Sequence, residues 1–335
     1  LYSLAWAHVD DEPVILSIPA SDRYYSFAMS GFDSDNFAYA GTRTTGNGGG
    51  HFAILPKGWK GELPEGVKAL TPAMTDYIFI VGRTLYGKDK ADQNAASELM
   101  KQYRLTPLSQ WDKREKYHAT KRAWVKAPKP AVDALDPTSN PLGHWQAMLD
   151  ALARFPTPDE HKVMFNLMKA LGLKPGINVE KDLDEATKKG LARAAVDGFQ
   201  KLKFVSTKFG DKVNGWTITP AEFGRAGLGG HYLMRAALQS LAGIVANDQE
   251  EAVYIYSATD VSGTPLDGNK AYQVHFTKEQ LPPAQAFWSI TNYTMKFNFV
   301  ANEWKKYNLG DRDKGLVYDA EGGLTVYFSS IPPKD

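Results

Sequence analysis

Three arginines lie within apolar or small-residue stretches, where a charged side chain needs a partner. Arg43 lies in AGTRTTG, Arg83 in FIVGRTLY and Arg235 in YLMRAALQ. A guanidinium that loses its water without gaining a partner costs free energy, so each must form an ion pair or meet a ligand. Ion pairs between layers of the fold are the favoured interpretation. Recognition of an anionic or carbonyl-bearing ligand is the alternative.

The seven histidines lack the spacing of a zinc site. No His-Glu-x-x-His motif occurs, and the absence of cysteine excludes thiolate ligands and disulfides. His51, His231 and His275 lie in or near β-rich sequence and are the better site candidates. His161 shares a helical face with apolar residues and is expected to pack against them. The sequence therefore predicts no metal site and no cofactor.

Other residue types with catalytic potential carry weaker signals. Asp33 and Asp35 alternate and would share one face of a strand or turn, where a solvated strand end is the favoured interpretation over a working carboxylate pair. The acidic stretch 260–267 lacks the alternating oxygen ligands of a calcium loop. No Gly-x-Ser-x-Gly elbow occurs, so Ser289 is expected to be structural.

The stretch GNGGG, residues 46–50, has the glycine content of a phosphate-binding loop. Such a loop needs Gly-x-x-x-x-Gly-Lys-Ser/Thr before a helix, whereas GNGGG has no such lysine and precedes the strand-like HFAILP. We therefore predict the tip of a β-hairpin, in which the glycines adopt positive φ. Arg43 is expected on the incoming strand, on the same face as Tyr39, with its charge paired or stacked on a ring.

Composition limits the classes of protein that fit. The 335 residues include 39 basic and 38 acidic side chains, for a net charge of +1, and 43% are apolar. No general attraction to nucleic acid or to an anionic membrane follows from this balance. No apolar run approaches the roughly 20 residues of a membrane helix. The first residue is not Met, so we expect a processed start from which a signal peptide has been removed.

The spacing of apolar residues changes twice along the chain. Short alternating segments predict strands in residues 1–110 and again in 248–330, and helical spacing predicts helices in 142–204. We expect an α+β multidomain protein with two antiparallel β-sandwich or jelly-roll-like domains and a helical insert. The expected parts are an N-terminal β domain (1–110), a connector with helices (111–205) and a C-terminal β-rich domain with one leading helix (206–335).

Long motifs resemble a bacterial family. RYYSFAMSGFDSDNFAYAGTRTTGNGGG and PKGWKGELPEGVK resemble the domain of unknown function numbered 1254, and HYLMRAALQSLAGIVANDQEEAVYIYSATD and LPPAQAFWSITNYT resemble its usual companion, the domain of unknown function numbered 1214. The resemblance implies two β-sandwich-like domains with a helical insert, in a protein that is often exported. It implies no established reaction and no set of catalytic residues.

These observations leave three functions open. The first is a periplasmic or secreted protein that binds a small or carbohydrate-like molecule between its β domains. The second is a metal-independent hydrolase or lyase that uses Asp, His and Tyr as acid–base groups. The third is a structural envelope protein, and a homo-oligomer is expected. The candidate ligand-binding residues are Tyr39, Arg43, His51, Arg83, Arg235, Trp288 and Tyr293.

Overall fold

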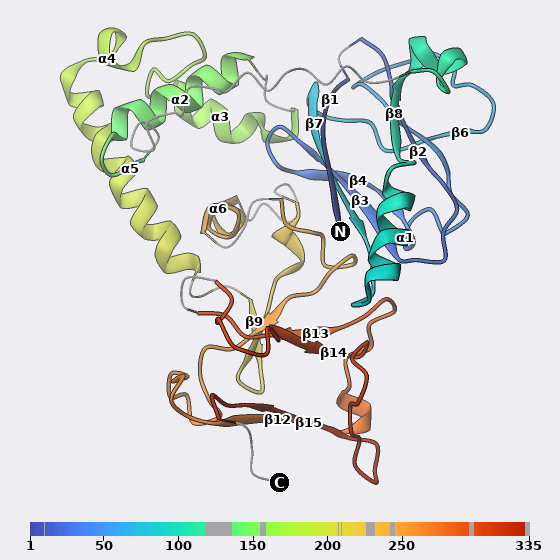
Figure 1. The fold of residues 1–335 in the computed structure, drawn as a ribbon. Helices are drawn as coiled ribbons and strands as arrows, with labels where there is room; N and C mark the ends of the chain where they lie inside the picture. Colours follow the sequence, from blue (N-terminus) through green and yellow to red (C-terminus); the bar gives the residue numbers. More distant parts are fainter. Residues whose placement is uncertain are drawn as a thin grey trace. The chain divides into compact units, whose positions relative to one another are not determined.

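The computed structural model has two compact units, Leu1–Tyr256 and Ser257–Asp335 (Figure 1). The structure describes residues 1–9, 11–117, 136–154, 159–206, 208, 210–225, 232–241, 245–294 and 298–331. Residues 118–135 of the predicted connector, and the candidate site residue His231, lie outside the described residues.

A four-stranded antiparallel sheet forms the first layer of the first unit. Its strand order is β1 (Tyr2–His8), β7 (Tyr77–Thr84), β3 (Tyr25–Gly31) and β4 (Asn36–Gly41). The central strands are rich in β-branched and aromatic residues, which favour extended backbone. Strands β3 and β4 are joined by a tight turn, and this turn carries Asp33 and Asp35.

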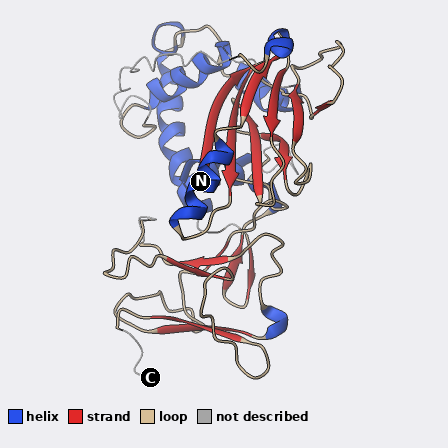
Figure 2. Ribbon diagram, turned by 45° about the vertical axis from the view of Figure 1, so that its right-hand side comes forward, coloured by secondary structure: helices blue, strands red, loops and turns tan. Residues whose placement is uncertain are grey.

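A second four-stranded sheet shares its core with the first (Figure 2). Side chains from both sheets, such as Phe27, Ile78, Leu16 and Phe52, form one buried cluster, and burial of this apolar surface stabilises the pair of sheets. The order of the second sheet is β6 (Val67–Ala69), β5 (Gly50–Ile54), β2 (Val14–Ile18) and β8 (Arg104–Pro107), with only β5 and β6 parallel.

Helices make up much of the rest of the first unit. Leu149, Leu173, Val179 and Leu191 form a separate apolar core among them. The described helical elements are α1 (Lys90–Met100), η1 (Leu108–Lys113), α2 (Pro141–Arg154), η3 (Asp159–His161), α3 (Lys162–Lys169), α4 (Val179–Asp182), α5 (Glu185–Ser206), η4 (Ala221–Phe223) and α6 (Tyr232–Leu241). A small sheet joins β9 (Asp211–Val213), β10 (Trp216–Ile218) and β11 (Ile255–Tyr256).

The second unit consists of two short antiparallel pairs linked by long loops. Strand β12 (Tyr272–Phe276) pairs with β15 (Leu324–Phe328), and β13 (Ser289–Thr291) pairs with β14 (Asn308–Gly310). The short helix η6 (Lys278–Gln280) follows β12. Strands are shorter here than the sequence pattern predicts, because the alternating segments are interrupted by Gly, Pro and Asp turns.

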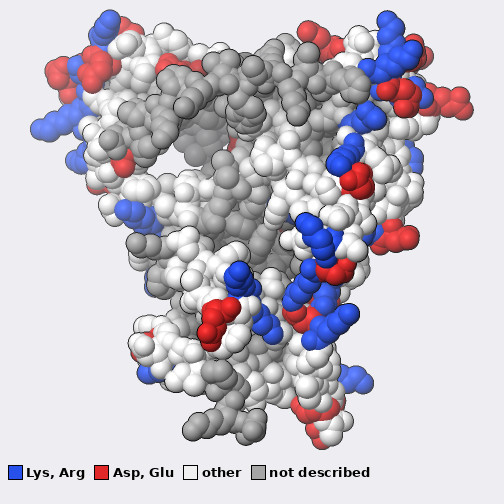
Figure 3. Space-filling view, viewed as in Figure 1, with Lys and Arg blue, Asp and Glu red and all other residues white. Residues whose placement is uncertain are grey.

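The α+β class predicted from sequence is confirmed. The sandwich or jelly-roll form of the β domains, the helical insert and the three-part division of the chain stay predictions. No helix among the described residues is long and apolar enough to cross a membrane. On the face shown in Figure 3, basic and acidic side chains lie intermixed, as the near-zero net charge suggests.

The prediction of a hairpin at GNGGG is wrong. Strand β4 pairs with β3 in one sheet, whereas β5 pairs with β2 and β6 in the other, so the glycines lie on a crossover between two sheets. The expected positive φ is confirmed at Gly46, Gly49 and Gly50. Arg43 lies in the turn after β4 and not on the strand itself. An alternating pattern predicts a strand but does not say which strand it pairs with.

Candidate functional site

The turn between β3 and β4 places two aspartates side by side. The N–H of Gly31 donates to the carbonyl of Asp35 (2.9 Å), which closes the turn, and Ser34 adopts a left-handed conformation with φ of 58°. The N–H of Asp35 donates to Oδ1 of Asp33 (3.1 Å). This contact uses Oδ1 of Asp33 and leaves its Oδ2 facing away from the backbone of the turn.

His161 brings an imidazole to the two aspartates from a distant part of the chain. Its Nε2 lies 3.6 Å from Oδ2 of Asp35 and 3.8 Å from Oδ2 of Asp33. Its Nδ1 lies 3.3 Å from the hydroxyl of Tyr232. The side chain of His161 is only 9% exposed, because the residue ends η3 and faces inward at the start of α3.

Arg235 contributes a buried guanidinium from helix α6. Its Nη2 donates to the carbonyl of Ser34, lies 3.4 Å from the hydroxyl of Ser34 and lies 3.8 Å from Oδ1 of Asp35. Its Nε is buried and has no hydrogen-bond partner among the described residues. We name Asp33, Asp35, His161, Tyr232 and Arg235 the Asp–His–Arg cluster.

Burial changes the protonation equilibria of the Asp–His–Arg cluster. Desolvation and the neighbouring charge of Asp35 raise the pKa of Asp33, against the opposing effects of the Asp35 N–H, His161 and Arg235. Desolvation also lowers the pKa of Arg235, although both aspartates oppose that shift. The cluster therefore combines a carboxyl that protonates more readily than usual with a nearby imidazole. Groups of these two types can serve as general acid and general base.

A second set of polar contacts fixes the end of the same turn. The amide nitrogen of Asn36 donates to the Tyr39 hydroxyl (2.9 Å), to the carbonyl of Ala246 (2.7 Å) and to Oδ1 of Asp248 (3.0 Å). Arg225 pairs with Oδ2 of Asp248 at 2.7 Å. Burial raises the pKa of the Tyr39 hydroxyl, which stays protonated and can donate. These contacts hold the turn against the 246–251 segment.

Two further arginines predicted from sequence also contact the 246–251 segment. Arg43 Nε lies 2.7 Å from the buried carboxylate of Glu251, which also accepts a 2.5 Å hydrogen bond from the Tyr24 hydroxyl. The Arg43 guanidinium lies 5.2 Å from the centroid of the Tyr39 ring. Arg83 donates to Asn247 at 3.0 Å. Arg43 thus forms the ion pair that the favoured interpretation expects, whereas the printed partner of Arg83 is a neutral amide.

His51 lies on β5, in the second sheet. Its Nδ1 lies 2.8 Å from the hydroxyl of Ser17, and its ring meets the ring of Trp111 edge-on with centroids 4.9 Å apart. Burial, and to a lesser extent the charge of Arg114, lowers the pKa of His51. These contacts are those of a residue packed between neighbours.

The remaining predicted site residues lie in the second unit. The backbone N–H of Trp288 donates to Oδ1 of Asp311 at 3.2 Å, and the centroid of its ring lies 6.4 Å from that of Phe276. Tyr293 stacks on Phe299 with centroids 5.4 Å apart and is half-exposed. The structure describes each unit by itself, so a shared wall with Tyr39 and Arg43 stays a prediction.

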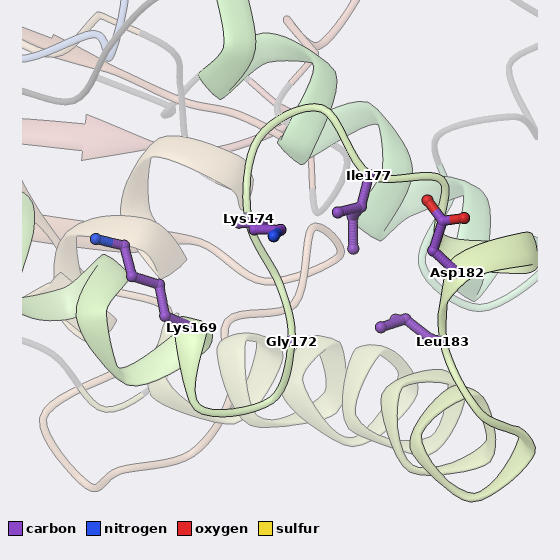
Figure 4. A pocket seen from close by; sticks show the side chains of 6 residues that line it. All are labelled: Lys169, Gly172, Lys174, Ile177, Asp182 and Leu183. Carbon is purple, nitrogen blue, oxygen red and sulfur yellow. The ribbon is translucent and has the colours of Figure 1, made fainter.

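A hollow near the α3–α5 connection offers a different kind of surface (Figure 4). It is open to solvent, and the side chains of Ile177 and Leu183 point into it. None of the residues of the Asp–His–Arg cluster lines it, and its polar groups do not converge. Its lining residues are Lys169, Gly172, Lys174, Ile177, Asp182 and Leu183.

Comparison with known proteins agrees with the motifs of the sequence. Residues 1–107 match the family model described as "Protein of unknown function (DUF1254)", and residues 251–335 match the one described as "Protein of unknown function (DUF1214)". The chain belongs to this two-domain family of unknown function. A search of curated proteins finds no match.

A solved structure shares the fold. The crystal structure of the VPA0106 protein from Vibrio parahaemolyticus superposes with a TM-score of 0.71 at 23% sequence identity. The match covers 99% of this chain and 77% of that protein. At this identity the likeness supports the fold alone.

The Asp–His–Arg cluster combines residues from the DUF1254 match with residues outside both matches. Asp33 and Asp35 belong to the DUF1254 match, whereas His161, Tyr232 and Arg235 lie between the two matched ranges. The sequence indicated the two aspartates and Arg235 separately, but it assigned His161 to packing. Nothing in the spacing of His161 connects it with the aspartates, because the fold alone brings them together.

Proposed function

We propose that this protein binds a small polar molecule, carbohydrate-like in its chemistry, at the Asp–His–Arg cluster. The observation that carries the proposal is that two nitrogens of the cluster, on His161 and on Arg235, make no short hydrogen bond to its other members. Nε2 of His161 lies 3.6 and 3.8 Å from its two carboxylate oxygens, beyond the roughly 3.2 Å limit of a good hydrogen bond. Nε of Arg235 is buried without a partner among the described residues. Buried polar groups usually have partners, so this unused capacity supports a bound molecule.

The residue types favour a ligand that carries both donors and acceptors. The aspartates accept hydrogen bonds when ionised, Arg235 can only donate, and His161 and Tyr232 can do either. Hydroxyl groups serve all of these partners, which is why a polyol or sugar fits better than a purely anionic ligand. The Asp33 side chain is 30% exposed, which gives such a molecule access to the cluster.

Among the residues predicted to bind the ligand, Arg235 is the one that we retain for this site. Tyr39, Arg43 and Arg83 contact the 246–251 segment and have the partners of structural residues. Ligand contacts by His51, Trp288 and Tyr293 stay predictions, as does a site between β domains.

Location and assembly belong to the same proposal. A periplasmic or secreted location is supported by the family resemblance of the sequence. Self-association is supported by the edge strand β1, on which Tyr2, Leu4 and Trp6 are 67%, 65% and 59% exposed. Fractionation of the native host and light scattering of the purified protein test these two points.

Calorimetric titration of the intact protein with a panel of sugars and polyols tests the proposal. We expect saturable binding of at least one compound, at least a tenfold loss of affinity in Arg235→Lys, and unchanged affinity in Arg193→Lys, since Arg193 is 82% exposed on α5. If the panel gives no binding, or if Arg235→Lys binds as wild type does, the proposal is wrong. Melting curves of both variants show whether each is folded.

An acid–base enzyme is the second candidate, and the raised pKa of Asp33 beside His161 favours it. Chromogenic glycosides and esters test for turnover. Activity that disappears in Asp33→Asn and persists in Asp159→Asn, at an exposed carboxylate, would support the enzyme over the binding protein.

A further inference from the structure

We propose that Asp33, Asp35 and His161 together bind a divalent transition-metal cation of the Zn²⁺ or Mn²⁺ kind. The ligand atoms are Oδ2 of each aspartate and Nε2 of the histidine. This inference rests on the proposed function. The cation would bind at the same cluster, and its open coordination positions would face the bound small molecule.

The spacing of the three ligand atoms suits a cation. They all lie within 4.8 Å of one another, and the two distances from His161 Nε2 are 3.6 and 3.8 Å. Two ligands bound at about 2.1 Å with a tetrahedral angle between them lie about 3.4 Å apart. The two distances from His161 are too long for direct hydrogen bonds, and they exceed the spacing of two metal ligands by only a few tenths of an ångström.

Each of the three residues has its other polar atom next to a neighbouring group. Nδ1 of His161 lies 3.3 Å from the Tyr232 hydroxyl, and Oδ1 of Asp33 accepts from the N–H of Asp35. Oδ1 of Asp35 faces the guanidinium of Arg235 at 3.8 Å. Metal ligands are typically oriented by outer partners of this kind, which fix the tautomer of the histidine and the direction of each carboxylate. These outer contacts are independent of the spacing of the ligand atoms. They leave the same three atoms, Oδ2 of each aspartate and Nε2 of His161, directed at one another.

The charge and type of the ligands narrow the choice of metal. Two carboxylates and a neutral imidazole carry a charge of −2, which a divalent cation neutralises. The imidazole favours a transition metal, because Ca²⁺ and Mg²⁺ prefer all-oxygen sites, and the absence of sulfur disfavours Cu⁺. Three protein ligands leave at least one position for water or for a hydroxyl of the bound molecule.

The rival state is a protonated His161 between the two carboxylates. With the two ionised aspartates it leaves a charge of −1, which the guanidinium of Arg235 balances, and it needs no metal. The two states differ in what the protein binds: a metal site takes up one cation per chain, whereas an ion-paired cluster takes up none.

The test is titration of the EDTA-treated, fully dialysed protein with ZnCl2, MnCl2, CaCl2 and MgCl2, followed by calorimetry and by melting temperature. We expect one Zn²⁺ or Mn²⁺ per chain, a raised melting temperature in its presence and much weaker binding of Ca²⁺ and Mg²⁺. Asp33→Asn and His161→Gln should each lower the affinity at least tenfold. His275→Gln, at an exposed histidine of the second unit, is the matched control and should bind as wild type does.

Two results would overturn the inference: no stoichiometric uptake by wild type, or wild-type affinity in Asp33→Asn. Asp33→Asn is the decisive variant if His161→Gln does not fold, because the Asp33 side chain is partly exposed. Repeating the sugar titrations with EDTA and with the bound metal separates the two proposals. Sugar binding without metal uptake refutes the metal site alone, and metal uptake without binding of any sugar refutes the proposed ligand.

Discussion

The two connections that flank β4 use their residues in opposite ways. The turn before β4, residues 32–35, joins neighbouring strands of one sheet and presents the side chains of Asp33 and Asp35 to distant partners. The connection after β4, residues 42–49, crosses to the other sheet. Its first part uses side chains, since Arg43 pairs with Glu251, but its glycine-rich end, residues 46–49, is held through its backbone. There the Tyr25 hydroxyl donates to the carbonyl of Gly46 (2.8 Å), and the N–H of Ser21 donates to that of Asn47 (3.0 Å).

This contrast shows that the most conspicuous composition need not mark the site. A glycine-rich stretch can meet a purely geometric need, since only glycine tolerates both positive φ and close backbone approach. A short polar turn draws little notice, yet its side chains can reach residues far away in the sequence. Substitutions in the two connections should therefore differ in kind: loss of backbone fit after β4, and loss of side-chain contacts before it.

The largest effect is expected from Gly49→Ala in the crossover. Gly49 has φ of +68°, and an added Cβ would lie 2.5 Å from the backbone nitrogen of Ala20 and 2.6 Å from the carbonyl oxygen of Ile18. The left-handed backbone costs about 1 kcal/mol and the overlap about 1–3 kcal/mol, so we expect a loss of about 3 kcal/mol in urea unfolding.

Gly46→Ala is the matched control for this substitution. Gly46 also has positive φ, at +78°, but an added Cβ meets nothing within 4 Å. We expect a loss of only about 1 kcal/mol. Equal losses in the two variants would show that close approach to the neighbouring strand is not what requires glycine at Gly49.

The second effect concerns Asn36, which anchors the charged turn. Asn36→Ala removes the donor that serves Tyr39, Ala246 and Asp248, and it leaves buried acceptors without that partner. We expect a loss of about 2–3 kcal/mol, because each buried polar group left unsatisfied costs about 1–3 kcal/mol. Weaker ligand or metal binding should accompany it, since the turn is no longer fixed.

Asn47→Ala gives the same chemical change in the crossover. The side-chain oxygen of Asn47 is buried and has no hydrogen-bond partner among the described residues. We therefore expect a change within about 0.5 kcal/mol. A loss as large as that of Asn36→Ala would mean that the glycine-rich end of the crossover also depends on side-chain contacts.

Much of the fold of the first unit could be predicted from local pattern. Alternating apolar residues gave strands in residues 1–110, and buried arginines were expected to have partners, as Arg43 and Arg83 do. Strand pairing could not be predicted, because period-two alternation fixes which face is buried and not which strand lies next to it. This is why the hairpin prediction at GNGGG was wrong.

The Asp–His–Arg cluster could be predicted only in pieces. The spacing of Asp33 and Asp35 in the sequence indicates a pair on one face, and the apolar neighbours of Arg235 indicate a charge within an apolar helix. His161 looks like a packing residue from its neighbours, and it is indeed buried. Its position beside the aspartates depends on how the helices pack on the first sheet, and no spacing rule contains that information.

The third effect separates the structural and ligand roles of Arg43. If Arg43 is structural, Arg43→Ala lowers stability, because Glu251 is left with the Tyr24 hydroxyl alone in a site that is 2% exposed. Since Arg43 itself is about one-third exposed, we expect about 1–2 kcal/mol, less than for a fully buried pair. Ligand affinity should stay unchanged. Unchanged stability with a loss of ligand affinity would show that Arg43 binds the ligand. Arg193→Ala, at an exposed arginine, is the control and should change neither quantity.

The smallest effect concerns His51, directly after the glycine-rich crossover. Burial lowers its pKa in the folded protein, so the unfolded chain binds the proton more readily. The folded state therefore loses stability as the pH falls below the unfolded value of about 6.5, and the loss is complete below the folded pKa; above 6.5 the group has no effect. In urea unfolding at about pH 7.5 and about pH 5, His51→Gln should lose less stability than wild type between the two conditions. The variant His275→Gln should behave as wild type does, because that ring is on the exposed surface of the second unit.

If His51 instead served a ligand, the pH profile of binding, and not that of unfolding, would change in His51→Gln. That result would assign side-chain chemistry to the glycine-rich connection and reverse the contrast between the two turns.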